Sequence, residues 1–215
     1  MSPKESVILF DLDGTLIDST EAILESFEAA YARFGQRRPE TERITAEIGH
    51  PLDGMFLSLG IPPERVAEYV SAYKRHYRQI SREKTTLLPD AGRAVERAAV
   101  EARLGIVTTK TAEYSIELLE HMGLMGYFDV LIGREDVIHP KPHPEPIHKA
   151  LSILDAKGDS CWMIGDTCMD MHSARSAGIV GIGVTCGYAA PEQLAACSSH
   201  VRKSALDAVV FIAES

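Results

Sequence analysis

The chain has 215 residues, of which 45% are hydrophobic and 25% charged, and its formal net charge is −9. This composition is typical of a globular protein, and the length suits one α/β domain or a core domain that carries a smaller insert. An acidic chain with scattered Lys and Arg lacks the basic clusters that hold nucleic-acid phosphates, and no apolar run reaches the ~18 residues that a membrane span needs. We therefore expect neither a nucleic-acid binder nor a membrane-spanning protein.

The four cysteines and the first residues bear on the cellular compartment. The cysteines show neither a Cys-x-x-Cys pair nor the spacing of zinc ligands, so we expect four free thiols in a reducing compartment. They are Cys161, Cys168, Cys186 and Cys197. The amino terminus lacks the basic stretch and long apolar run of a secretory signal. Together these features predict a cytoplasmic protein.

The first part of the chain predicts one strand followed by helices. The apolar run at 7–10 predicts a buried strand, and no strand is expected between residues 20 and 84. The expected helices run from Glu21 to Phe34, over 40–48 and 51–59, and from Glu64 to Arg82. The simplest account is an α-helical cap inserted at 18–85, with a core domain formed by 1–17 and 86–215. The alternative is that these helices pack on one face of the sheet.

From about residue 86 onward, strands and helices alternate. Short apolar runs predict strands at 104–107, 130–132 and 161–164, with a weaker one at 180–184. Helices are expected between them, at 90–102, 112–122, 144–155 and 169–177. This alternation predicts an α/β fold with a doubly wound parallel sheet. Ligands of such sheets bind at the carboxyl ends of the strands.

Polar residues of a useful kind follow these strand ends. They are Asp11 and Asp13, then Thr108, Thr109 and Lys110, then Lys141 in a later loop, and finally Asp166 and Asp170. Several carboxylates that converge are costly to bury unless a cation lies between them, and an open site of oxygen ligands suits Mg²⁺ best. A lysine and a threonine hydroxyl beside such a site are natural partners for phosphate oxygens.

The two acids after the first strand are open to different roles. Asp11 could attack phosphorus as a nucleophile and form an aspartyl-phosphate. Asp13, two residues on, would point the same way in an extended chain and could protonate the leaving oxygen and then deprotonate water. Gly14 would let the chain turn sharply, so that backbone amides there could contact phosphate.

Four stretches of the chain carry a pattern that extends over residues 7 to about 184. They are Asp11-x-Asp13-Gly14-Thr15-Leu16, an apolar strand that ends in Thr108, Lys141 in Lys-Pro-His-Pro-Glu-Pro, and Gly165-Asp166-Thr-x-x-x-Asp170. In this order they resemble the four signature motifs of the haloacid dehalogenase-like hydrolase superfamily. The resemblance implies a Rossmann-like core with a helical cap at the insert.

The resemblance also implies a role for each motif residue. Asp11 would be the nucleophile and a Mg²⁺ ligand, and Asp13 the acid/base that also offers its backbone carbonyl to the metal. Thr108 and Lys141 would hold phosphate. Asp166 would bind Mg²⁺ directly, and Asp170 would orient Lys141 or a metal-bound water.

Asp13 favours phosphoryl transfer over dehalogenation, because a leaving alkoxide needs a proton and a leaving halide does not. The segments 10–19, 48–52 and 106–110 resemble the corresponding segments of phosphoglycolate phosphatases and their pyrophosphatase relatives. The expected substrate-binding residues are Gly14, Gly49, Thr109 and Lys110. The chain departs from the pattern of these phosphatases at two positions. They commonly have Asn at the position of Thr109 and Gly at the position of Pro140. Lys110 could bind the substrate, or it could equally be a solvent-exposed lysine at the start of a helix.

The predicted function is a Mg²⁺-dependent phosphatase that hydrolyses a small phosphorylated metabolite, a phosphoglycolate-like ester or pyrophosphate, through an aspartyl-phosphate. The alternatives are a beta-phosphoglucomutase-like phosphomutase and a non-catalytic phosphate-binding module. Ser19 or Asp18 is expected to cap the first cap helix. The group His139, His143 and His148 is not expected to bind a transition metal, because carboxylate-rich sites favour hard cations. The sequence does not indicate the oligomeric state.

Overall fold

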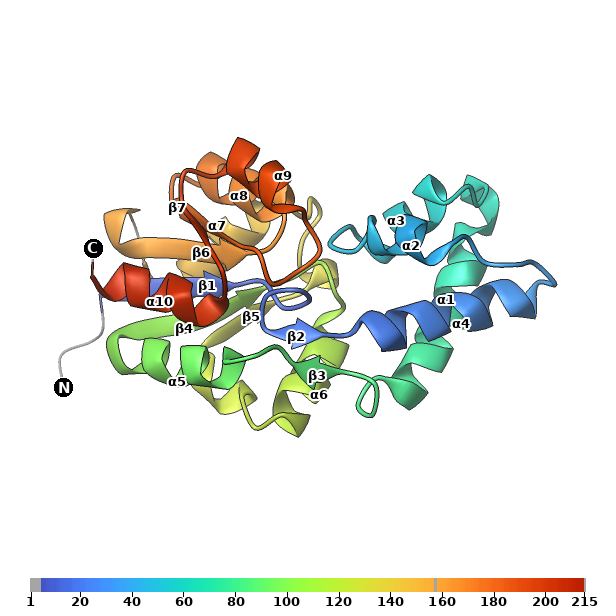
Figure 1. Cartoon of the computed structure of the whole chain (residues 1–215), viewed down its shortest axis with the longest axis horizontal. Coiled ribbons are helices and arrows are strands. Elements are labelled where there is room, and N and C mark those ends of the chain that lie inside the picture. Colours follow the sequence, from blue (N-terminus) through green and yellow to red (C-terminus); the bar gives the residue numbers. More distant parts are fainter. Residues whose placement is uncertain (1–4, 157, 215) are drawn as a thin grey trace.

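Within residues 5–156 and 158–214, which the computed structural model describes, a six-stranded parallel sheet forms the centre of the fold (Figure 1). Its strands lie side by side in the order β5 (Val130–Ile132), β4 (Ala102–Val107), β1 (Ser6–Phe10), β6 (Cys161–Gly165), β7 (Val180–Val184) and β8 (Val201–Arg202). Every neighbouring pair is parallel. The five strands expected from the apolar runs are present, and β8, with two residues, was not predicted.

Helices cover both faces of this sheet, which is why the strands are almost continuously apolar. Ile8 and Phe10 of β1 belong to one apolar cluster, whereas Val7 and Leu9 belong to another. The first cluster is completed by α5 (Ala91–Glu101), α6 (Ala112–His121) and α10 (Ala205–Ala213), and the second by α7 (Glu145–Ile153) and α8 (Cys168–Ser176). The predicted doubly wound α/β fold is therefore confirmed.

The remaining elements of the core are short. Of these, α9 (Pro191–Cys197) packs against α8 and β7 and was not predicted, as α10 was not. The 3₁₀ turns of the core are η2 (Met125–Tyr127), η3 (Arg134–Asp136) and η4 (Gly158–Ser160), while η1 (Pro63–Arg65) lies in the helical insert. In the part of the chain that the structure describes, no helix has the length and apolar character that crossing a membrane requires.

The helical insert has its own apolar core. It contains α1 (Thr20–Arg33), α2 (Thr41–Thr45), α3 (Leu52–Ser58) and α4 (Val66–Ile80), and Figure 1 shows these helices beyond the carboxyl end of the sheet. Phe27 and Phe56 meet at its centre with ring centroids 4.7 Å apart, and Tyr69 packs on Phe34 at 4.5 Å. The helices pack on one another and do not cover a sheet face. The exact boundaries, 18 and 85, stay a prediction.

Two very short strands carry the chain into and out of the helical insert. β2 (Ile17–Asp18) pairs antiparallel with β3 (Thr86–Leu87), so that Ile17 faces Leu87 in register. Two-residue strands have too little alternation to be recognised in a sequence. Entry and exit of the helical insert therefore lie side by side (Figure 1).

The expectation of four free thiols is wrong for two of them. Cys168 and Cys197 form a disulfide with their Cα atoms 5.7 Å apart, while Cys161 and Cys186 are free. Cys168 begins α8 and Cys197 ends α9, and the packing of these two helices brings the two residues together. Their separation of 29 residues follows no recognisable motif. The argument from free thiols to a reducing compartment therefore no longer applies.

Candidate active site

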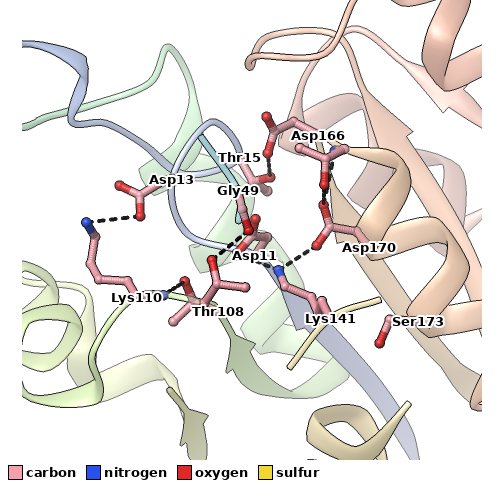
Figure 2. Close-up of polar contacts among 12 residues, drawn as sticks. Asp11, Asp13, Thr15, Gly49, Thr108, Lys110, Lys141, Asp166, Asp170 and Ser173 are labelled. Atoms are coloured by element: carbon pink, nitrogen blue, oxygen red, sulfur yellow. Dashed lines mark hydrogen bonds and ion pairs between the residues drawn. The ribbon is translucent and has the colours of Figure 1, made fainter. Parts of the chain in front are cut away.

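The carboxyl ends of three adjacent strands place the first site residues together (Figure 2). Asp11 follows β1, Thr108 follows β4 and Asp166 follows β6. Backbone hydrogen bonds continue the sheet past the strand ends, because Asp11 N donates to Ile164 O at 2.9 Å and Thr108 N to Ile132 O at 3.0 Å. The parallel topology therefore fixes where these side chains start.

Three buried carboxylates, Asp11, Asp166 and Asp170, form what we call the acidic cluster, and Lys141 lies against it. The Lys141 Nζ is 2.8 Å from Asp11 Oδ1 and 2.5 Å from Asp170 Oδ1. All four residues are at most 3% exposed. Burial disfavours the charged form of a carboxyl group, and one lysine does not balance three of them.

The pKa values of the acidic cluster reflect this excess of negative charge. Burial raises the pKa of Asp11 to about 7, although Lys141 opposes the shift. Burial, with the nearby charges of Asp11 and Asp170, raises the pKa of Asp166 well above its usual range. Burial alone would lower the pKa of Lys141, but the two carboxylates it contacts raise it. Added positive charge would stabilise the ionised acids.

The acidic cluster fits a hard divalent cation. Carboxylate oxygens from its three residues lie within 4.8 Å of one another, and oxygen-only donors suit Mg²⁺ or Ca²⁺ better than a transition metal. Two glycines leave room beside Asp166, since a Cβ at Gly14 or Gly187 would come 2.3 or 2.2 Å from its Oδ2. Gly14 also has a φ of +80°.

Asp166 and Asp170 are held in different ways. Asp166 accepts hydrogen bonds from Thr15 Oγ1 at 3.0 Å and from Tyr188 N at 2.8 Å. Asp170 Oδ2 accepts from Thr167 N and Oγ1 at 3.0 and 2.7 Å, while its Oδ1 accepts from Lys141. Asp170 is thus fixed at the start of α8 in a position that orients Lys141, which is one of the two roles that the sequence left open for it.

The carboxylate of Asp13 lies apart from the acidic cluster. Its Oδ2 is 3.1 Å from Lys110 Nζ, and its Oδ1 accepts from the Ser19 hydroxyl. Lys110 also donates to the Tyr77 hydroxyl at 3.0 Å, and its side chain is only 11% exposed. The alternative prediction, that Lys110 is a solvent-exposed lysine, is therefore wrong. Ser19 does precede α1, but its hydroxyl binds Asp13, and it is the other predicted residue, Asp18, whose Oδ1 accepts from the backbone N of Thr20 at the start of α1, at 2.9 Å.

A cavity of about 290 Å³ lies between the helical insert and the sheet edge. Asp13, Gly49, Thr109 and Lys110 all line it, whereas Gly14 lies against Asp166. The Thr109 hydroxyl donates to Gly49 O at 2.7 Å, so threonine at this position links the sheet edge to the helical insert. Thr108 is buried beneath, and its Oγ1 accepts from Lys110 N at 3.2 Å.

The family model for haloacid dehalogenase-like hydrolases matches residues 8–184, most of the chain. The chain belongs to this family. The predicted resemblance is therefore confirmed, and all four motifs fall within the matched range.

Curated relatives narrow the enzyme class. This hydrolase is 35% identical to the Probable phosphatase IndB of Dickeya dadantii over 91% of the chain and 87% of that protein. It is 36% identical to the Pyrophosphatase PpaX of Anoxybacillus flavithermus over 88% of each chain. A haloacid dehalogenase-like hydrolase from Streptococcus pneumoniae superposes with a TM-score of 0.87 at 26% identity, covering 97% and 98% of the two chains. The chain is accordingly a phosphoric ester hydrolase, as predicted.

The histidines of this hydrolase lie outside the acidic cluster. His139 and His143, on an exposed loop, come together with Glu145, the first residue of α7, and His148 lies further along the same helix. Backbone hydrogen bonds from Ile138 and His139, with the His139 ring, lower the pKa of Glu145 to about 2. Glu145 thus ties the loop together. The expectation that the three histidines bind no transition metal stays a prediction.

Several site residues of the hydrolase were missed from the sequence. Gly187 and Tyr188 lie shortly after β7, which ends at Val184, and a search for site residues beyond this weakly predicted strand would have found them. Tyr73 and Tyr77 are four residues apart on α4, a spacing that equally describes a helix face packed in the core. Tyr114, on α6, carries no signal at all in the sequence.

Proposed function

We propose that this hydrolase is a Mg²⁺-dependent phosphatase that cleaves a small phosphorylated metabolite through an aspartyl-phosphate on Asp11. The observation that carries the proposal is the division between two carboxylates of one short segment. Asp11 belongs to the acidic cluster with Lys141, whereas Asp13 faces the cavity. The curated relatives, named as a phosphatase and a pyrophosphatase, support the same chemistry.

The metal would be held by Asp11, Asp166 and the backbone carbonyl of Asp13. When bound, Mg²⁺ would supply positive charge that favours the carboxylate form of Asp11 and neutralises the phosphoryl oxygens. Lys141 adds a fixed positive charge 2.8 Å from Asp11 Oδ1. Thr108, at the end of β4, offers a hydroxyl to the phosphoryl group. Positioning and charge neutralisation are the main contributions to phosphoryl transfer.

The covalent steps use the chain's own carboxylates. An oxygen of Asp11 attacks phosphorus, the bond to the ester oxygen breaks, and Asp13 gives its proton to that leaving oxygen. Asp13 then takes a proton from the water that attacks the aspartyl-phosphate, which releases phosphate and regenerates Asp11. Ser19 and Lys110 hold the carboxylate of Asp13 on the cavity side for both transfers.

The arrangement also bears on the two alternative functions. A module that only binds phosphate has no use for a second acid held at the cavity, so the position of Asp13 weighs against it. A phosphomutase would return the phosphoryl group to its own product, and it would yield isomerised sugar phosphate in excess of free phosphate.

The test is phosphate release from a panel of phosphoglycolate, pyrophosphate, sugar phosphates and nucleotides, with Mg²⁺ and with excess chelator. Asp11→Asn is expected to lower turnover by at least about 10³-fold, since it removes the nucleophile. The matched control is Asp90→Asn, an exposed residue of the α5 N-terminus, which is expected to keep full activity. Full turnover by Asp11→Asn, or undiminished turnover in chelator, would contradict the proposal.

A further inference from the structure

The cavity beside Asp13 is where the leaving group of a bound phosphate ester must lie. Asp13 lines it, while the three residues of the acidic cluster do not. Because Asp13 serves the leaving oxygen under the proposed function, a phosphoryl group at the acidic cluster directs the rest of the substrate into this cavity. The lining of the cavity therefore reports which leaving groups the site accepts.

Three tyrosines form one side of the lining, and we call them the tyrosine wall. The rings of Tyr73 and Tyr77 are stacked, with centroids 5.6 Å apart and an angle of 11° between their planes. The Tyr77 and Tyr114 rings follow at 5.8 Å. The other apolar lining residues are Ile23, Ile48, Leu52, Met55 and Val70. Such a surface suits an aromatic or flat apolar body.

The charged groups of the cavity are already engaged in part. Lys110 pairs with Asp13, donates to the Tyr77 hydroxyl and lies 4.6 Å from the centroid of the Tyr77 ring. The guanidinium of Arg134 donates to Val137 O at 3.2 Å. Lys74 also lines the cavity, so a polar substituent on the substrate is compatible with it.

We propose that the substrate is a phosphomonoester whose alcohol part carries an aromatic ring or a comparable flat apolar body. This inference rests on the proposed function and narrows it. Pyrophosphate and phosphoglycolate would each place a further negative charge beside the Asp13 carboxylate, whose partner Lys110 is already engaged, and would leave the apolar lining uncovered. An aromatic body would instead lie against the half-buried Leu52 and Val70 and against those edges of the tyrosine wall that reach the cavity.

The first test compares kcat/KM for benzyl phosphate, ethyl phosphate, phosphoglycolate and pyrophosphate in the presence of Mg²⁺. Benzyl and ethyl phosphate both release primary alcohols of similar acidity, so their difference reports contact with the ring. We expect benzyl phosphate to be at least about tenfold better than ethyl phosphate, and better than both anionic substrates. If none of these four compounds is hydrolysed, the proposed function is contradicted. Hydrolysis in which benzyl phosphate is not preferred would leave that function intact and overturn this inference.

A substitution in the lining sharpens the test. Val70→Asp places a carboxylate in the cavity and is expected to lower the ratio of kcat/KM for benzyl over ethyl phosphate at least fivefold. The control, Val100→Asp, changes a residue of α5 that is 73% exposed, and both rates are expected to stay the same. If Val70→Asp does not fold, Tyr114→Leu replaces one ring of the tyrosine wall by an aliphatic group and should lower the ratio about threefold. An unchanged ratio in whichever variant folds would overturn the inference.

Discussion

The acidic cluster and the cavity are neighbours at one edge of the sheet, but they are built in opposite ways. In the acidic cluster, each carboxylate has polar partners at hydrogen-bond distance, among them Lys141, Thr15 and the backbone of Tyr188. The cavity is lined mainly by side chains of the helical insert, in which apolar residues and tyrosine rings stand beside charged groups such as Asp53 and Lys74. We infer that the sheet edge determines the chemical step and that the helices determine which substrate reaches it.

The largest effect is expected from replacing Lys141, the lysine that pairs with the acidic cluster. Lys141→Met leaves buried carboxylates without their ion-pair partner, so we expect kcat/KM to fall at least about 10³-fold. With excess chelator present, so that no metal is bound, the free energy of unfolding measured by urea denaturation should be about 3 kcal/mol lower than that of the unchanged protein. The preference for benzyl over ethyl phosphate, measured on the residual activity, should remain.

The matched control is Lys149→Met, because the Lys149 side chain is 40% exposed and contacts Asp136 outside the acidic cluster. Its stability is expected to change by less than about 1 kcal/mol, with activity unchanged. If Lys141→Met removed the substrate preference as well, the two regions would not act separately.

A smaller effect is expected from a methyl group placed beside the acidic cluster. The Cβ of Gly187→Ala would come 2.2 Å from Asp166 Oδ2 and must displace that carboxylate. We expect the Mg²⁺ concentration for half-maximal activity to rise about 10- to 100-fold, without a change in substrate preference. Gly126→Ala, where a Cβ would meet nothing within 4 Å, is the control. Equal Mg²⁺ dependence in the two variants would mean that Asp166 does not bind the metal.

The smallest effect concerns the contact that joins the two regions. Thr109→Val removes the hydrogen bond to Gly49 O, worth about 1 kcal/mol, and we expect KM to rise about fivefold with kcat nearly unchanged. Thr45→Val removes hydroxyl contacts within α2 and serves as the control. A fall in kcat with constant KM would show instead that Thr109 positions the acidic cluster.

The acidic cluster could be predicted from the sequence because its residues follow strand ends. Parallel strands bring their carboxyl ends to one edge, so a short pattern around Asp11, Lys141 and Asp166 already implies proximity in space. The partner of Asp13 was harder to foresee. Lys110 could equally have faced solvent, and the choice was made by packing against Tyr77 of the helical insert, 33 residues away.

The cavity could not be predicted in the same way. Its lining depends on how the helices of the insert pack against α6. In the sequence, each apolar residue of the lining has the same pattern as a residue of the hydrophobic core. The disulfide between Cys168 and Cys197 escaped for a related reason, because it depends on the contact between α8 and α9 and not on a local spacing. Local sequence patterns do not show which residues pack together when they are far apart in the chain and belong to no motif.

The antiparallel pair of β2 and β3 has a consequence for how such a protein can change. Because the chain departs and returns at adjacent residues, Ile17 and Leu87, the intervening segment can be exchanged for that of a relative without altering the register of the parallel sheet. New substrate ranges would then arise by replacing one module, while the residues that perform hydrolysis are inherited unchanged.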